Sequence, residues 1–63
     1  MTAESLMHQG GQYYRLARDA TDREREYWRA RLIDAVNASR EAFGDCWVTC
    51  ELEGLLTELG EPR

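Results

Sequence analysis

Apolar and small side chains recur every three or four residues through the middle of the chain. Between Trp28 and Phe43 they fall within about 120° of arc on a helix of 3.6 residues per turn. This stripe consists of Trp28, Leu32, Ala35, Val36, Ser39, Ala42 and Phe43. Gly44 follows at once, and glycine commonly ends a helix in a left-handed cap. The pattern predicts an amphipathic helix that ends at Phe43.

The start of this helix is indicated by Thr21 and Glu24. A Thr-x-x-Glu capping box lets the hydroxyl and the carboxylate accept hydrogen bonds from backbone N–H groups at a helix start. We therefore expect the helix to begin near Asp22 and to cover residues 22–43.

A second apolar stripe follows with the same spacing, made of Val48, Leu52, Leu55, Leu56 and Leu59. Asp45 is a suitable N-cap residue, and Gly60 and Pro62 would end the segment, so we predict a helix over residues 45–59. Only Gly44 and Asp45 link it to the preceding helix. A link this short predicts a helical hairpin with the two stripes facing each other.

The N-terminal part gives a weaker pattern. Tyr13, Leu16, Ala17 and Ala20 form one short helical face, but Gly10-Gly11 precedes it, and glycine costs about 1 kcal/mol in a helix interior relative to alanine. We therefore expect a helix over residues 12–20 and treat residues 1–11 as a candidate flexible segment. If the helix instead continued back through the glycines, Leu6 would extend its face and Thr2 would cap it. The expected fold is a single all-α domain of residues 1–63, with a dimeric helical bundle as a candidate assembly.

The chain has 63 residues, of which 43% are hydrophobic, so its core must be small. Domains of this size often need a disulfide, a metal or a second chain for stability, which makes self-association an expectation.

No apolar run reaches the roughly 18 residues that span a bilayer, and the first residues do not resemble a signal peptide, which predicts a cytoplasmic protein. All eight basic residues are arginine, and Ile33 and Asn37 are the sole Ile and Asn. This usage is typical of GC-rich coding, as in some bacteria and their phages.

The net charge of −4 lies at one end of the chain. Acids and arginines balance in residues 1–43, whereas residues 44–63 hold Asp45, Glu51, Glu53, Glu58 and Glu61 against Arg63 alone. An acidic segment repels nucleic acid and attracts basic protein surfaces.

Cys46 and Cys50 share one side of the predicted third helix at i, i+4 spacing. A zinc site would need two more ligands, and the single histidine, His8, lies far away in the sequence. We expect reduced, metal-free cysteines and no cofactor. Neither a nucleophile–base–orienter set nor a glycine-rich phosphate loop is visible, so the sequence predicts a non-enzymatic protein.

Six arginines and several aromatic residues lie between Tyr13 and Arg31, which superficially resembles a nucleic-acid surface. Acids share the window, and pairs such as Arg15 with Asp19 have the i, i+4 spacing of a salt-bridged helix face. The alternative hypothesis is a small DNA-binding regulator with a turn at Ala20-Thr21 and a reading helix that presents Arg23, Arg25 and Arg29.

The favoured interpretation is a helical protein–protein interaction module of the adaptor, inhibitor or regulator type. Aromatic residues are enriched in interface hot spots, and four large side chains project off the predicted stripes. The candidate partner-binding residues are Tyr14, Tyr27, Ile33, Trp47, Glu51 and Glu58. We further expect a homodimer formed through the third helix, because Trp47, Cys46 and Cys50 would otherwise remain in water.

Overall fold

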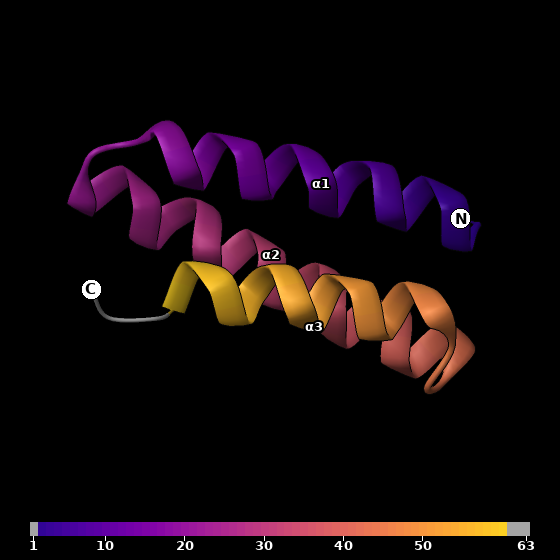
Figure 1. Ribbon diagram of the computed structural model, residues 1–63. Coiled ribbons are helices and arrows are strands. Elements are labelled where there is room, and N and C mark those ends of the chain that lie inside the picture. Colours follow the sequence, from indigo (N-terminus) through magenta and orange to yellow (C-terminus); the bar gives the residue numbers. More distant parts are fainter. Residues whose placement is uncertain (1, 61–63) are drawn as a thin grey trace.

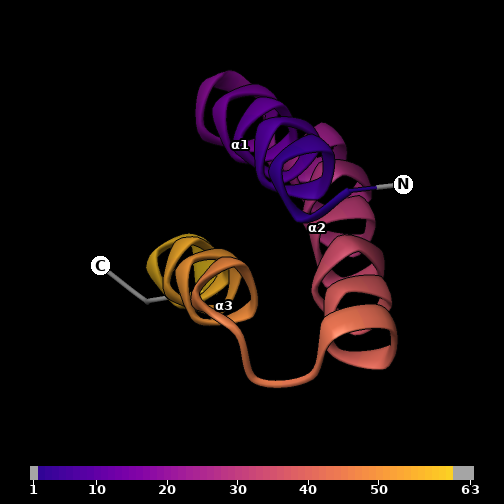
Figure 2. The same ribbon diagram turned by 90° about the vertical axis from the view of Figure 1, so that its right-hand side faces the viewer.

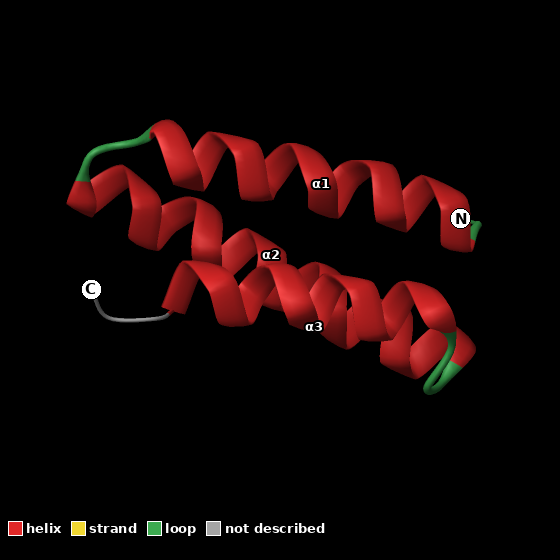
Figure 3. Cartoon of the chain, viewed as in Figure 1, coloured by secondary structure: helices red, strands yellow, loops and turns green. Residues whose placement is uncertain are grey.

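The computed structural model describes residues 2–60, and these residues form three helices joined by short links (Figures 1 and 3). They are α1 (Ala3–Asp19), α2 (Asp22–Phe43) and α3 (Trp47–Gly60). Each helix runs antiparallel to the one before it, so α1 and α3 point the same way. The prediction of an all-α fold is confirmed.

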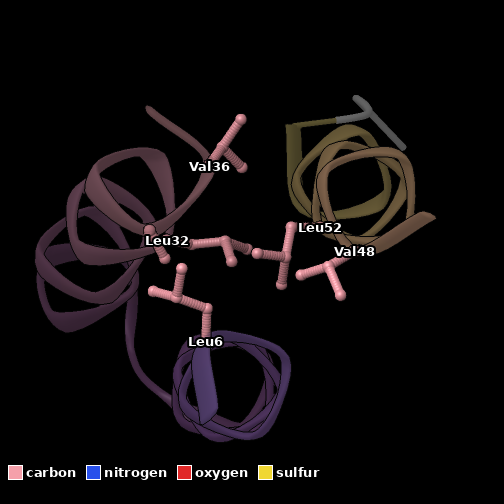
Figure 4. Close-up of a cluster of buried hydrophobic side chains, with 6 residues drawn as sticks. Leu6, Leu32, Val36, Val48 and Leu52 are labelled. Carbon is pink, nitrogen blue, oxygen red and sulfur yellow. The ribbon is translucent and has the colours of Figure 1, made fainter. Parts of the chain in front are cut away.

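The helices surround one small hydrophobic core, to which all three contribute. Seen nearly end-on in Figure 2, they occupy the corners of a triangle, and each packs against both of the others. Leu6 from α1, Leu32 and Val36 from α2, and Val48 and Leu52 from α3 converge at the centre (Figure 4). The core is therefore shared by three helices rather than enclosed by a two-helix hairpin.

The first helix is much longer than the sequence pattern predicted. It begins at Ala3 instead of Gln12 and continues through Gly10-Gly11 without a break. Thr2 occupies the N-cap, and its Oγ1 accepts a hydrogen bond from the backbone N–H of Ser5 at 3.1 Å. Leu6 is only 3% exposed, so the added turns bury a leucine in the core, which offsets the helical cost of the glycines.

Gly10 has a packing role that its helix propensity does not reveal. It is buried, and a Cβ built there would overlap Cδ2 of Leu52 and lie 3.3 Å from its Cγ. Leu52 is itself fully buried. The missing side chain of Gly10 therefore lets α1 approach α3 closely, whereas a Cβ at Gly11 would meet nothing within 4 Å.

The boundary of α2 was predicted correctly, but not the capping box. Thr21 occupies the N-cap and its carbonyl accepts a hydrogen bond from Arg25 N at 2.7 Å, yet its side chain makes no capping bond. The side chain of Arg25 instead reaches back, and its Nε donates to the carbonyl of Ala17 at 3.2 Å. A cation at the carboxyl end of α1 is favourable because that end of a helix carries partial negative charge.

The turn between α2 and α3 differs from the predicted one. Gly44 ends α2, but its φ of 71° and ψ of −148° place it in a region used almost only by glycine, not in the left-handed helical region. Helix α3 begins at Trp47, with Cys46 and not Asp45 at its cap, since Cys50 N donates to the carbonyl of Cys46. The carboxylate of Asp45 turns instead toward Arg40, 4.0 Å away.

A chain of hydroxyl groups fixes this turn to the core. The Thr49 hydroxyl donates to the carbonyl of Gly44 at 2.7 Å, and therefore its oxygen accepts from the Ser39 hydroxyl, also at 2.7 Å. Both side chains are fully buried. Each hydroxyl thus has a partner, which removes the penalty for burying it.

The predicted α2 stripe is buried at its centre and exposed at its carboxyl end, whereas the α3 stripe is buried at its start and half-buried at Leu55, Leu56 and Leu59. Val48 and Leu52 of α3 are buried, as are the central members of the α2 stripe, and Trp28 is half-buried. Ala42 and Phe43, also assigned to the core, are exposed. Helix α2 has 22 residues and α1 has 17, so the last turn of α2 extends beyond the region that α1 covers.

Substitution of the two adjacent glycines by alanine should have opposite effects on stability. Gly10→Ala should lower the free energy of unfolding by about 1–3 kcal/mol, because the new methyl group overpacks against Leu52. Gly11→Ala should raise it by roughly 0.5–1 kcal/mol through helix propensity alone. Urea unfolding followed by circular dichroism measures both changes, and equal effects at the two sites would contradict the close approach of α1 and α3.

Removal of the Thr49 hydroxyl should also destabilise the fold. Thr49→Val keeps the side-chain shape but leaves the Ser39 hydroxyl buried without its acceptor, at a cost of about 1–3 kcal/mol. Thr57→Val is the matched control, because Thr57 is exposed and its hydroxyl bonds only within its own helix. The double variant with Ser39→Ala should lose less than the sum of the single changes, whereas strict additivity in urea melts would argue against a shared hydrogen bond.

Candidate functional site

One exposed flank of α3 lies about 110° around the helix from the buried Val48 and Leu52. Trp47, Glu51, Gly54 and Glu58 follow each other at i, i+4, i+7 and i+11, which places them within about 60° of arc. All four are exposed, and Trp47 retains 62% of its accessible surface. We call these four residues the α3 outer face.

The charge on this face is uniformly negative. Residues 44–60 contain no basic residue. The two ion pairs among residues 2–60 both involve Arg40, which contacts Glu53 and Asp45 and so ties α2 to α3. Glu51 and Glu58 take part in neither pair.

The other candidate partner-binding residues lie elsewhere. Tyr27 on α2 is 52% exposed. Tyr14 is half-buried and packs against the core from α1, and Ile33 is half-buried on α2. The structure therefore does not bring the six candidates together on one surface; it leaves Trp47, Glu51 and Glu58 as a contiguous group.

An aromatic cluster on α1 and α2 was not predicted. The rings of Tyr13 and Trp28 stack with centroids 5.9 Å apart, and Tyr27 meets Trp28 edge-on at 4.9 Å. Arg31 lies 5.4 Å from the Tyr27 ring centre and donates a hydrogen bond to its hydroxyl at 3.2 Å. A signal was present in the sequence, because Tyr13 and Trp28 are equally distant from the Ala20-Thr21 link, and antiparallel helices meet at such positions.

The arginines of the nucleic-acid hypothesis do not share a face. At 100° per residue, Arg23 and Arg25 point in nearly opposite directions, and Arg25 is engaged with the carbonyl of Ala17. A Cβ built on Gly60 would lie 3.2 Å from the Arg29 guanidinium, so Arg29 sits beside the carboxyl end of α3. Two of the three arginines thus lie at helix ends of negative partial charge.

The helix pair also differs from a helix-turn-helix, because α1 and α2 lie side by side along most of their length (Figure 1). The predicted pairing of Arg15 with Asp19 is not formed, since no ion pair within 4 Å joins these two described residues. The arginine-rich window is therefore not a salt-bridged face.

The two cysteines occupy the first turn of α3 with their thiols unpaired to each other. Cys46 is half-buried at the cap position and Cys50 is exposed. The backbone N–H of Thr49 donates a hydrogen bond to the Cys46 sulfur and lowers the pKa of this thiol. The Thr49 hydroxyl oxygen lies 3.7 Å from the sulfur, but its proton is donated to the carbonyl of Gly44. Desolvation opposes this effect only in part.

Chemistry beyond this thiol has little support in the described part of the chain. His8 is exposed on α1, where its Nε2 lies 3.3 Å from Gln12 Nε2, and no hydrogen bond joins it to either cysteine within residues 2–60. Over the same residues, no cluster of three or more His, Cys, Asp or Glu side chains is arranged to hold a metal ion.

Comparison with protein-family models, with curated proteins and with solved structures finds no match for this chain. Within residues 2–60, no helix combines the length and the apolar character that crossing a bilayer requires. The functional argument therefore rests on the surfaces of the molecule itself.

The lowered pKa of Cys46 should appear in its reaction with iodoacetamide. In a Cys50→Ser variant, half-maximal alkylation should occur at lower pH in the native protein than in urea, because folding favours the thiolate. The matching contribution to stability is present above the unfolded pKa and is lost as the pH falls through the folded pKa. The same midpoint in native and unfolded chains would rule out the capping hydrogen bond from Thr49.

Proposed function

We propose that this chain is a non-enzymatic, cytoplasmic protein-binding module whose α3 outer face receives a basic segment of another protein. The observation that carries the proposal is the exposed ring of Trp47 next to carboxylates that no cation of the described chain neutralises. Tryptophan is among the residues most enriched in interface hot spots. A single exposed apolar residue needs no explanation, so the argument depends on its surroundings.

The negative charge of the α3 outer face favours a basic partner over an acidic one. Glu51 and Glu58 lie one and three turns from Trp47 on the same face, and the segment 44–60 offers no arginine to balance them. A partner that brings lysine or arginine would gain electrostatic attraction at both carboxylates and a cation–π contact at the indole. An acidic partner or a nucleic-acid backbone would be repelled by the same groups.

The shape of the face suits an elongated partner. Gly54 lies between the two glutamates, and a Cβ built on it would meet no atom within 4 Å, so this point of the face carries no side chain at all. A partner segment can therefore approach the α3 backbone at Gly54 while it contacts Trp47 on one side and Glu58 on the other. Spacings of i, i+4, i+7 and i+11 are those by which helices recognise one another.

The alternative of DNA binding has less support. The only form of it that charge allows uses Arg23, Arg25 and Arg29; Arg23 points away from the other two, and Arg25 and Arg29 share their surface with Asp22 and Glu26 at helix ends. Phosphate binding requires several cations along one track. We therefore keep duplex DNA as an outcome of the test and not as a second proposal.

Binding can be tested with a basic amphipathic helical peptide whose heptads carry leucine on one face and arginine on the other. The peptide is titrated into a Trp28→Phe variant, in which the tryptophan fluorescence comes from Trp47 alone. We expect a saturable change in tryptophan emission that weakens as salt is raised. The Trp47→Ser variant lacks this signal, so its binding is measured by the fluorescence anisotropy of the peptide. We expect the substitution to weaken binding by about 2 kcal/mol, roughly 30-fold in Kd.

Charge-reversal variants supply the control. Glu51→Arg and Glu58→Arg should each weaken peptide binding, whereas Glu26→Arg, an equal charge change at an exposed site on α2, should not. Equal losses in all three variants would indicate a response to net charge only and would overturn the proposed face. Retention of a random DNA duplex at low salt, lost on Arg23→Glu, would instead support the regulator alternative.

A further inference from the structure

The exposed side of α2 carries a stripe of charges that reverses sign at its middle. Arg23 and Arg31 lie in the first half, and Asp34 and Glu41 in the second. Tyr27 and Ala38 lie on the same stripe, one in each half, and all six residues are exposed and fall within about 80° of arc. Glu24 lies just outside the stripe, about 20° beyond Arg31 around the helix, at the level of Glu41 in a reversed copy.

The stripe is complementary to itself when one copy is reversed. Arg31 and Asp34 have their midpoint between Leu32 and Ile33, and so do Tyr27 and Ala38. The outer pair, Arg23 and Glu41, has its midpoint at Leu32, half a residue away. In an antiparallel pair of α2 helices centred there, each arginine meets a carboxylate of the other copy and Tyr27 meets Ala38.

We propose that two copies of this chain associate about a twofold axis next to Leu32 and Ile33, through the α2 stripe. Twofold dimers use the same patch on both subunits, so every contact occurs twice. The proposal concerns a different surface from the α3 outer face, and each can be present without the other.

A hollow on the same side of the molecule provides a place for the partner's tyrosine. It has a volume of about 180 Å³ and lies between α1 and α2. Leu6, Tyr13, Ala35 and Ala38 supply apolar lining, and Arg31 and Asp34 the charged groups. A cavity of about 150 Å³ accommodates a benzene ring. Tyr27 of one copy would lie opposite Ala38 of the other, so the exposed part of its ring would cover the mouth of this hollow while Arg31 and Trp28 of its own copy still hold it.

The contact groups are already held in place within each copy. Arg31 donates to the Tyr27 hydroxyl and lies over its ring, and Trp28 supports the same ring edge-on. Arg31 makes no ion pair with Asp34 of its own chain, because the ion pairs of residues 2–60 both involve Arg40. Less side-chain entropy is lost on association when such groups are fixed beforehand.

Charge favours α2 over α3 as the dimer contact. The α3 outer face would bring Glu51 and Glu58 of both copies together with no cation on that face. Figure 2 shows that α3 lies to one side of the α1–α2 pair, so a twofold axis on the opposite side of α2 leaves both α3 outer faces open. The dimer would then present two copies of the proposed binding face.

Charge reversal tests the pairing directly by sedimentation equilibrium. We expect the wild-type chain to be dimeric at tens of micromolar. Arg31→Asp and Asp34→Arg should each weaken the dimer by about tenfold or more, because each places like charges across the axis twice. The double variant, with the two charges exchanged, should restore the wild-type dissociation constant.

Mixing the two single variants provides the sharpest result. One carries two acids at the contact and the other two arginines, so the mixture should form a 1:1 heterodimer more tightly than either variant dimerises alone. Arg15→Asp, an exposed arginine on the outer side of α1, is the matched control and should leave the dimer unchanged. Circular dichroism of each variant would show that the helices remain folded.

Three outcomes would overturn the proposal. One is a wild-type mass of a monomer at 100 µM. Another is a dimer that tolerates both single reversals and gives no preference for heterodimers. The third is a dimer dissociated by Trp47→Ser but not by Arg31→Asp, which would assign the contact to α3.

Discussion

Gly10 of α1 lies against the side chain of Leu52 of α3, and the close approach of these two helices shapes the rest of the molecule. Because Gly10 has no Cβ, the Leu52 side chain can occupy the centre between the helices, in the same buried cluster as Leu32. A third helix can then share the core with the α2–α3 pair. Without it, a chain of 63 residues would have only the two facing stripes to bury.

The shared core determines which residues remain for interaction. Each helix turns one face inward, and the three inner faces together hold nearly all of the branched aliphatic side chains. The exposed large hydrophobic side chains are few: Leu16, Tyr27, Phe43 and Trp47. Two of these, Tyr27 and Trp47, belong to the proposed surfaces, where charged residues of defined sign accompany them. Leu16 and Phe43 lie at helix ends that the neighbouring helices cover incompletely.

The arginines illustrate how one residue type serves different purposes in a small fold. Arg40 joins α2 to α3 through Glu53 and Asp45, and Arg25 and Arg29 lie at carboxyl ends of helices. Arg31 holds the ring of Tyr27. A composition rich in arginine therefore does not by itself indicate nucleic-acid binding, because guanidinium groups also neutralise helix ends and support aromatic rings.

The candidate sites could be predicted from the sequence only in part. Trp47 and the acidic residues after it lie off the leucine stripe, and helical periodicity alone is enough to place them on the outside of α3. Tyr14 projects off the predicted stripe as well, but it is half-buried because α1 is long enough to lie across the other two helices. The stacking of Tyr13 on Trp28 follows from their equal distance from the Ala20-Thr21 link once α1 and α2 are known to pair, whereas the hollow beside Ala38 depends on side-chain packing that no local pattern specifies.

The helical class, the bounds of α2 and the inward faces of α2 and α3 follow from periodicity and local end signals, and so could be predicted before the structure was known. The tertiary structure decided the length of α1, since Gly10 is costly in an isolated helix and becomes favourable only against Leu52. The start of α3 also departs from the local signal, because Cys46 and not Asp45 caps the helix, while the exposed Asp45 carboxylate lies 4.0 Å from Arg40. At Gly10 a contact between residues distant in the sequence outweighs a local preference of about 1 kcal/mol.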